Sequence, residues 1–291
     1  MLLSTQTSAL VGRFGFEDGI LKLRDAGYDR LDLSLFEMSF DNSVYNADDW
    51  RKTTEQRRAF ADANGILFDQ AHAPFSFAWA DENVRENIAN PRILRSLEIA
   101  AIMGVRNIIV HPLHWFPYKG FEKEAREMNI AYYRSFIPIC RDLGINVALE
   151  NMWQKEVKRK CISFDVAAKA EEFASYLDEI DDEHIVGCLD VGHVSLIGEE
   201  AEDAIRVLGH DRLKALHVHD NGYTADDHQL PGLGKMNWPA IMKALKEIDY
   251  TGVFTYEADG FLRNFENDFI PAACRFMVER GRHLISMADA E

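Results

Sequence analysis

The chain has 291 residues, of which 47% are hydrophobic and 27% charged, the composition of an ordinary soluble globular protein. Its 32 basic and 48 acidic side chains give a formal net charge of −16, which repels polyanions and disfavours nucleic acid as a partner. No apolar run could span a bilayer, no basic leader opens the chain, and the four cysteines lack C-x-x-C spacing, so we expect a cytoplasmic protein with reduced, mostly buried cysteines.

A repeat of about forty residues runs through the first half of the chain. Each unit shows a helix end, a glycine and a short apolar run, and the glycines Gly27, Gly65, Gly104 and Gly144 are spaced by 38, 39 and 40 residues. Glycine just past a helix supplies the left-handed conformation that ends it. A period near forty residues fits one strand–helix unit with its loops.

Eight amphipathic segments are predicted to be helices, because apolar residues recur in them every three or four positions. Pro91 is expected to kink or restart the third of these, and Pro239 fits the first turn of the seventh. The predicted helices span residues 16–28, 48–64, 84–103, 121–143, 164–177, 201–208, 238–248 and 268–287.

Eight short strands are predicted between these helices. Several of them, such as VRNIIV and INVALE, are continuous apolar runs, as expected when both faces of a strand are buried. Strands alternating with helices predict a single domain, residues 1–291, folded as a closed (β/α)8 TIM barrel. The alternative is a doubly wound open sheet, but no glycine-rich phosphate loop follows the first strand. The predicted strands span residues 2–6, 30–36, 66–72, 105–111, 145–150, 185–190, 213–219 and 252–257.

Imidazole and carboxylate side chains recur where these strands end. The carboxyl ends of barrel strands converge on one face, where such enzymes place their active sites, so residues far apart in sequence would share one pocket. Imidazole and carboxylate are also the ligands that divalent metals prefer. The residues at or just past the strand ends are His72, His111, Glu150, Asn151, Asp190, His193, His217, His219 and Glu257, with Asp226 and His228 in the loop after the seventh strand.

Each of these residues also has an ordinary structural explanation. His72 and His111 could be loop histidines, Asp190 could cap a helix, and Glu257 could pair with a surface lysine. Charged residues are however seldom buried unless they are paired or metal-bound, and taken jointly these strand ends favour a metal site. His219 is expected at the rim of the pocket rather than in the site. The remaining histidines are expected in loops or on the surface: His114, His184, His210 and His283.

With these motifs the chain resembles the xylose isomerase-like barrel superfamily, in particular its sugar phosphate isomerase/epimerase branch. The resemblance covers nearly the whole chain and rests on the order and spacing of several motifs. These are QAHAPFSF (70–77), IIVHP (108–112), ALEN (148–151), CLDVGH (188–193), LHVHDN (216–221), DDHQLPGLG (226–234) and TYE (255–257).

Resemblance to the ketose 3-epimerases of this superfamily implies one divalent metal, commonly Mn, Mg or Co. Its four ligands match Glu150, Asp190, His217 and Glu257, and a histidine that contacts substrate oxygen matches His193. Those epimerases carry an arginine six residues after the metal histidine, where this chain has Tyr223. The departure puts ketohexose epimerase activity in doubt and indicates a different substrate.

The chain also resembles the endonuclease IV class of apurinic endonucleases, whose trinuclear zinc site uses nine ligands. Against a DNA substrate stand the acidic composition and the loop after His72, which offers Phe75, Phe77 and Trp79 and lacks the Tyr- and Asn-bearing pattern of those enzymes. All nine ligand positions have a counterpart here: His72, His111, Glu150, Asp190, His193, His217, Asp226, His228 and Glu257.

We therefore expect a metal-dependent isomerase or epimerase that acts on a sugar or sugar-like polyol through an enediolate. Glu150 and Glu257 would be the acid/base pair and His193 a third catalytic residue, with Mn, Mg, Co or Zn as the metal. The alternatives are an apurinic endonuclease-like phosphodiester hydrolase, an inosose-type dehydratase, and a barrel that binds sugar without turnover. The residues expected to bind substrate are His72, His111, Tyr223, Asp226 and His228.

Several aromatic residues near the strand ends have two interpretations. Phe75, Phe77, Trp79, Trp115 and Trp153 could form an apolar wall of the pocket or pack in the core. The aromatic loops around Trp115, Phe116 and Tyr118 are expected to be exposed, as a lid or a dimer surface, so a homo-oligomer is left open.

Overall fold

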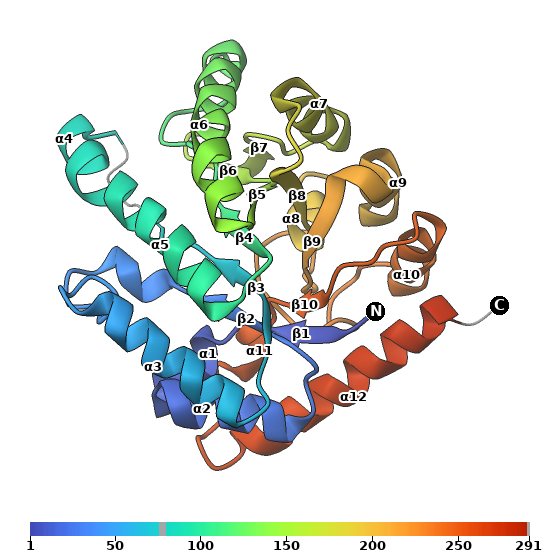
Figure 1. The fold of residues 1–291 in the computed structure, drawn as a ribbon. Coiled ribbons are helices and arrows are strands. Elements are labelled where there is room, and N and C mark those ends of the chain that lie inside the picture. The colour runs from blue at the N-terminus through green and yellow to red at the C-terminus, as the bar shows by residue number, and fades with distance from the viewer. Residues whose placement is uncertain (76–79, 290–291) are drawn as a thin grey trace.

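The computed structural model describes residues 1–75 and 80–289. Eight parallel strands lie at the centre of the fold (Figure 1). Six form one continuous sheet in the order β2-β3-β4-β5-β8-β9, and β1 pairs with β10. Their bounds are β1 (Leu3–Thr5), β2 (Leu31–Ser34), β3 (Phe68–His72), β4 (Asn107–Val110), β5 (Asn146–Glu150), β8 (Ile185–Asp190), β9 (Leu213–His217) and β10 (Phe254–Tyr256).

Two single bridges join these sheets into a closed ring. Gln6 pairs in parallel with Asp32 between β1 and β2, and Val218 pairs in parallel with Tyr256 between β9 and β10. Every strand therefore has a neighbour on both sides, which confirms the predicted (β/α)8 barrel and makes the open-sheet alternative wrong.

Helices surround the ring, as Figure 1 shows. The glycines of the repeat end several of them, for example Gly104 after α5 and Gly144 after α6, each in the left-handed conformation. The helices of this outer layer are α2 (Phe16–Ala26), α3 (Trp50–Ala63), α5 (Asn90–Met103), α6 (Glu122–Leu143), α7 (Ala170–Ile180), α9 (Ala201–Arg212), α10 (Trp238–Glu247) and α12 (Ile270–Asp289).

The helical segment around Pro91 restarts as predicted, because α5 begins at Asn90 with the proline in its first turn. The helix predicted over 164–177 is wrong in its first turn and a half. Phe164 ends a strand that pairs with Trp153, and Ala167 has a positive φ of 55°, so the helix starts only at Ala170.

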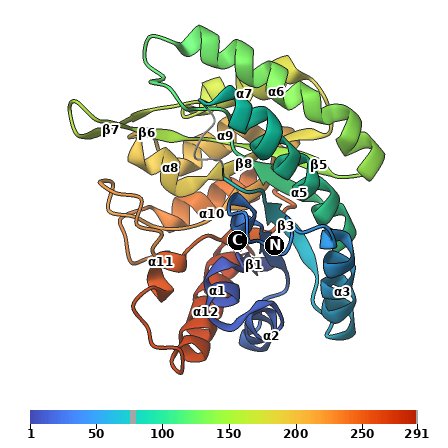
Figure 2. The same ribbon diagram turned by 90° about the vertical axis from the view of Figure 1, so that its left-hand side faces the viewer.

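Most of the short elements in the connections were not predicted; the exception is η2 (Arg85–Ala89), which lies inside the helix predicted over 84–103. A hairpin of two antiparallel strands follows β5, and Figure 2 shows it projecting on the same side of the barrel as the loop between β9 and α10. These elements are α1 (Ser8–Phe14), η1 (Phe36–Ser39), α4 (Glu82–Val84), η2 (Arg85–Ala89), β6 (Trp153–Glu156), β7 (Cys161–Phe164), α8 (Val191–Leu196) and α11 (Asp259–Leu262).

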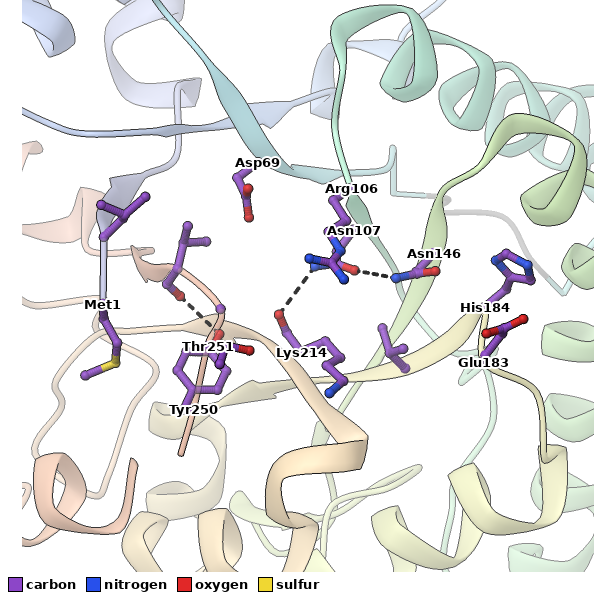
Figure 3. Close-up of a pocket in the computed structure, with 14 residues that line it drawn as sticks. Met1, Asp69, Arg106, Asn107, Asn146, Glu183, His184, Lys214, Tyr250 and Thr251 are labelled. Atoms are coloured by element: carbon purple, nitrogen blue, oxygen red, sulfur yellow. Dashed lines mark hydrogen bonds between the residues drawn. The ribbon is translucent and has the colours of Figure 1, made fainter. Parts of the chain in front are cut away.

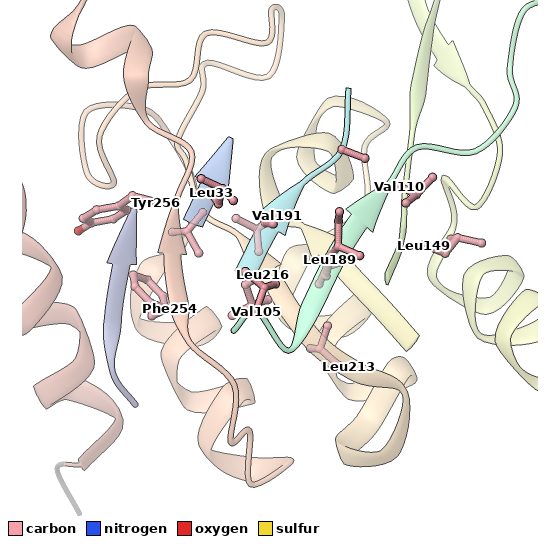
Figure 4. Close-up of a cluster of buried hydrophobic side chains, with 14 of the residues drawn as sticks. Leu33, Val105, Val110, Leu149, Leu189, Val191, Leu213, Leu216, Phe254 and Tyr256 are labelled. Carbon is pink, nitrogen blue, oxygen red and sulfur yellow. The ribbon is translucent and has the colours of Figure 1, made fainter. Parts of the chain in front are cut away.

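The core has two layers, set by the alternation of side chains along each strand. Ile109 and Ala148 belong to a small cluster inside the barrel. Their neighbours Val110 and Leu149 belong to the larger cluster between strands and helices (Figure 4). Because this alternation has a period of two, the next inward positions are the last residue of each strand or the one after it. That register aims the strand-end residues at the barrel axis.

Two expectations from composition can be compared with the structure. Cys140, Cys188 and Cys274 are buried and Cys161 is exposed on β7, so the cysteines are mostly buried, as predicted. Among the described residues, no helix combines the length and the apolar character that a membrane crossing requires.

Candidate metal centre

The four predicted metal ligands come together at the carboxyl ends of β5, β8, β9 and β10. Ligand atoms of Glu150, Asp190, His217 and Glu257 all lie within 4.8 Å of one another. His217 Nδ1 is 3.0 Å from Glu150 Oε1 and 2.9 Å from Glu257 Oε2. Ligands of a tetrahedral ion with bonds of about 2.0–2.2 Å are about 3.3–3.6 Å apart, so these side chains need to move by only a few tenths of an ångström to hold a divalent cation.

The electrostatics of this cluster also fit a cation. Burial opposes ionisation of Glu150 and Glu257, but His217 overcomes it and holds the pKa of both carboxyl groups well below the usual range. Burial likewise opposes protonation of His217, yet the two carboxylates raise its pKa well above the usual value. An imidazolium proton thus offsets the carboxylate charge, and a divalent cation could replace it.

A second group of ligand atoms joins the first at Glu150. His72 Nδ1 donates to the carbonyl of Ala73 at 2.8 Å, which leaves a lone pair on Nε2. That Nε2 lies 3.1 Å from Nε2 of His111, which in turn lies 3.0 Å from Glu150 Oε2. Burial lowers the pKa of His111 to about 4, so its ring is neutral at pH 7, as a metal ligand must be.

A third group lies across Asp190 and contains the two residues predicted in the loop after β9. His193 Nε2 is 3.4 Å and His228 Nε2 3.2 Å from Asp226 Oδ2. Their Nδ1 atoms donate to the carbonyls of Asn151 and Glu257 at 2.8 and 2.7 Å. A backbone carbonyl on the outer nitrogen is the usual device that orients a ligating histidine. This arrangement offers a further cation site.

The structure brings nine of the ten predicted site residues into these three groups, and places the tenth elsewhere. Tyr223 is 40% exposed, and its hydroxyl donates to the carbonyl of Lys235 on the same loop. Its role in substrate binding stays a prediction. Asp190 also accepts from the backbone N–H of His193, so it caps α8 as well as facing the site.

The expectation that His219 lies at the rim of the pocket is wrong. His219 is fully buried, and its Nε2 lies 3.0 and 3.2 Å from the two carboxylate oxygens of Asp190. The pairing of Val218 with Tyr256 extends the β9 register past His217, so the alternation turns His219 inward as well.

The aromatic residues divide between the site and the surrounding structure. Phe75 packs 5.1 Å from the ring of His72, and Trp153 Nε1 donates to Asp226 at 3.4 Å. The expectation of an exposed Tyr118 is wrong: it is buried, because its hydroxyl bonds to Glu172. Phe77 and Trp79 lie outside the described residues.

Three buried polar residues near the centre were not predicted. Gln6 Nε2 donates to Glu257 Oε1 at 2.7 Å and so orients that carboxylate. Asp32 lies inside the barrel and accepts from Gln70 at 2.9 Å. Asp220 accepts four hydrogen bonds at the base of the loop that carries Asp226. A signal for Asp32 was present in LDLSL, where an acidic residue interrupts a buried strand.

A separate cavity of about 720 Å³ lies at the opposite, amino-terminal ends of the strands. Polar residues such as Asp69, Arg106 and Lys214 line it, and Asn146 donates to Asn107 across it (Figure 3). This face of a TIM barrel ordinarily serves stability rather than catalysis, and it contains none of the metal-type groups described above.

The chain is similar in sequence to several known proteins. A probable endonuclease 4 from Bacillus licheniformis is 26% identical over 211 residues, 64% of each chain. A D-psicose 3-epimerase from Enterocloster bolteae is 34% identical over 87 residues, 30% of this chain and 27% of that one. An uncharacterized protein of Methanocaldococcus jannaschii is 28% identical over 193 residues, 64% of this chain. The chain spans between 50% and 62% of the length of the first curated relatives that it matches.

Solved structures share the fold over almost the full length. A D-tagatose 3-epimerase-like protein has a TM-score of 0.77 at 19% identity, covering 99% of this chain and 98% of that one. A 3-keto-D-glucoside 4-epimerase from E. coli has a TM-score of 0.72 at 19% identity, covering 97% and 99%. The IOLI protein with a bound zinc atom has a TM-score of 0.74 at 14% identity, covering 98% of both chains. A family model described as xylose isomerase-like TIM barrel matches residues 20–278, and the chain belongs to that family.

Proposed function

We propose that the protein is a metal-dependent isomerase or epimerase of a sugar or sugar-like polyol. The observation that carries the proposal is the position of two glutamates. Glu150 and Glu257 reach the same nitrogen of His217 from β5 and β10, strands that β8 and β9 separate in the ring. A substrate bound between the glutamates would present them with opposite faces. Relatives and structural neighbours named as sugar epimerases support this class of substrate.

The chemistry needs a proton to leave and return at a carbon beside a carbonyl group. When bound, a divalent metal supplies a Lewis acid that polarises this carbonyl. One glutamate takes the proton from the carbon, which leaves an enediolate, and the other returns a proton to the opposite face, which inverts the carbon. Return to the neighbouring carbon instead gives isomerisation. At the start of the reaction the first glutamate must be ionised and the second must carry a proton, and the two groups exchange these states in each turnover. Gln6 and His217 hold Glu257 in place.

The remaining groups of the centre would bind the polyol. His193 Nε2 and His228 Nε2 face the cluster and could donate to substrate hydroxyls when protonated. His72 and His111, on the other side of Glu150, would contact a neighbouring oxygen. Trp153 and Phe75 supply apolar surface beside these histidines.

Solvent deuterium exchange tests the proposal directly. With Mn, Mg, Co or Zn added, a panel of ketoses and inososes in D2O should yield carbon-bound deuterium with at least one substrate. Glu257→Gln and Glu150→Gln should each abolish exchange. Asp227→Asn, on the exposed part of the loop after β9, is the matched control and should retain it. Absence of exchange across the panel with metal bound would overturn the enediolate mechanism.

A second candidate is an endonuclease-like phosphodiester hydrolase. The three ligand groups, which share Glu150 and Asp190, support it, as does similarity to a probable endonuclease 4. The net charge of −16 opposes a DNA substrate. Three zinc ions per chain together with cleavage of abasic DNA would favour this candidate over the epimerase. An inosose-type dehydratase would show exchange followed by loss of water, and a binding protein would show neither.

A further inference from the structure

His219 is buried between two of the ligand groups and contacts both. On one side its Nε2 lies 3.0 and 3.2 Å from the carboxylate oxygens of Asp190. On the other its ring stacks on that of His228, with centroids 4.2 Å apart and an interplanar angle of 10°. Asp190 belongs to the group around His217, and His219 itself lies within ligand distance of Asp190 and His193 on one side and of Asp226 and His228 on the other. One side chain thus bridges the two groups.

Gly192 makes room for this side chain. A Cβ atom at Gly192 would lie 2.0 Å from Cε1 and 2.4 Å from Nε2 of His219, closer than any real contact. The glycine follows Asp190 by two residues, and His219 follows His217 by two. The two motifs therefore fit each other in space, although Gly192 lies in α8 and His219 lies just past the end of β9.

We propose that His219 is a positioning residue that holds Asp190 and His228 in the orientation that metal binding needs. Its Nε2–H donates to the Asp190 carboxylate, which also accepts from the backbone N–H of His193 at 2.8 Å. Its ring fixes one face of His228, whose Nδ1 is held by the carbonyl of Glu257. This inference rests on the metal binding of the proposed function but not on turnover.

A direct ligand role for His219 fits the geometry less well. The rings of His219 and His228 are nearly parallel, so the in-plane lone pairs on their Nε2 atoms do not converge on one point. Nε2 of His219 also lies closer to Asp190, at 3.0 Å, than to Asp226, at 3.6 Å. A donor to a carboxylate explains the contacts without a metal bond.

The test compares two replacements of similar size. His219→Gln keeps an N–H donor near the position of Nε2, whereas His219→Leu fills the space without one. Metal-free protein is titrated with Mn²⁺ and with Zn²⁺ by calorimetry, and bound metal is counted after dialysis. We expect affinity about 10–100-fold lower for the leucine variant, since loss of an orienting partner has that effect, and near wild type for the glutamine variant. His283→Leu, at an exposed histidine of α12, is the control.

Gly192→Ala supplies an independent arm, because it displaces the His219 ring without altering any ligand. It should reproduce the loss seen with leucine, while circular dichroism and metal-free melting temperature show that the chain is folded. Wild-type metal affinity in the leucine variant or in Gly192→Ala would overturn the proposal. An equal loss of metal affinity in the glutamine and leucine variants would also overturn it, because that result would make His219 a ligand. Failure of the wild-type protein itself to bind either metal would overturn the proposed function as well.

Discussion

The carboxylate of Asp220 ties down the loop that carries Asp226 and His228. Its Oδ1 accepts from the backbone N–H of Asn221 and Met236 at 2.9 and 3.2 Å. Its Oδ2 accepts from the backbone N–H of Gly232 and from Nε1 of Trp238, both at 2.7 Å. Both ends of the loop are therefore bound to one fully buried carboxylate.

Asp220→Asn places an amide NH2 where one oxygen now accepts two hydrogen bonds. A hydrogen bond to a charged group contributes about 1.5–3 kcal/mol, so loss of two should lower the free energy of unfolding by about 3–6 kcal/mol. The loss of stability should be large, because the substitution leaves buried N–H groups without an acceptor. The loop should also loosen, which moves Asp226 and His228 away from His193 and weakens metal binding.

Urea unfolding of metal-free protein measures the stability change, and metal titration measures the effect on the site. Asp227→Asn is the matched control, because Asp227 is exposed on the same loop and its replacement should change stability by no more than about 0.5 kcal/mol. A decrease below about 1 kcal/mol for Asp220→Asn would refute this account of the loop.

Three further outcomes follow from the same structure. Burial raises the pKa of Asp32 to about 6, against the opposing influence of His217 and His72. The folded state therefore holds this proton more tightly than the unfolded chain does. The stability that Asp32 contributes is lost as the pH rises from about 4 through 6. Asp32→Asn should raise the free energy of unfolding of metal-free protein by up to about 3 kcal/mol at pH 7 and should not raise it at pH 4. Urea unfolding at both pH values measures this, and an equal increase at the two pH values would contradict the prediction. In melting experiments, a divalent metal at 100 times its wild-type Kd should stabilise the wild-type protein by about 2.7 kcal/mol. The same metal concentration should stabilise the His217→Ala variant far less. Metal binding at pH 7 should release protons, because Asp226 raises the pKa of His228 to about 10 despite burial. Calorimetry in buffers of different ionisation enthalpy measures this release. A binding enthalpy that does not depend on the buffer would contradict the prediction.

The barrel and most of the centre could be predicted because they depend on local rules. Apolar runs repeated at a forty-residue period specify strands, and the two-residue alternation carries Ala148 to Glu150 and Ala215 to His217. A chain that closes into a barrel then brings all strand ends together. The forty-residue repeat and the closed barrel topology are enough to bring these residues together.

The supporting contacts could not be predicted because their partners are distant in sequence. Gln6 bonds to Glu257 only because the first and last strands become neighbours in the closed ring. His219 looked like a rim residue because a local pattern does not show that Val218 still pairs with Tyr256. The helix predicted over 164–177 includes Phe164, the last residue of the hairpin after β5, because a helical periodicity does not show that Phe164 pairs with Trp153.

The charges inside the centre support the proposal that it binds cations. The carboxylates of Glu150, Asp190 and Glu257 lie at or just past the ends of neighbouring strands, and that of Asp226 lies beside them in the loop after β9. Burying a charge is costly unless it is paired. Among the described residues, protonated imidazoles offset these charges, and the carboxylates hold the pKa values of His193 and His217 well above normal against the effect of burial. Histidines whose outer nitrogens are already hydrogen-bonded to backbone carbonyls are oriented for metal rather than for protons. Under the proposed function, divalent cations would replace the protons that these histidines carry.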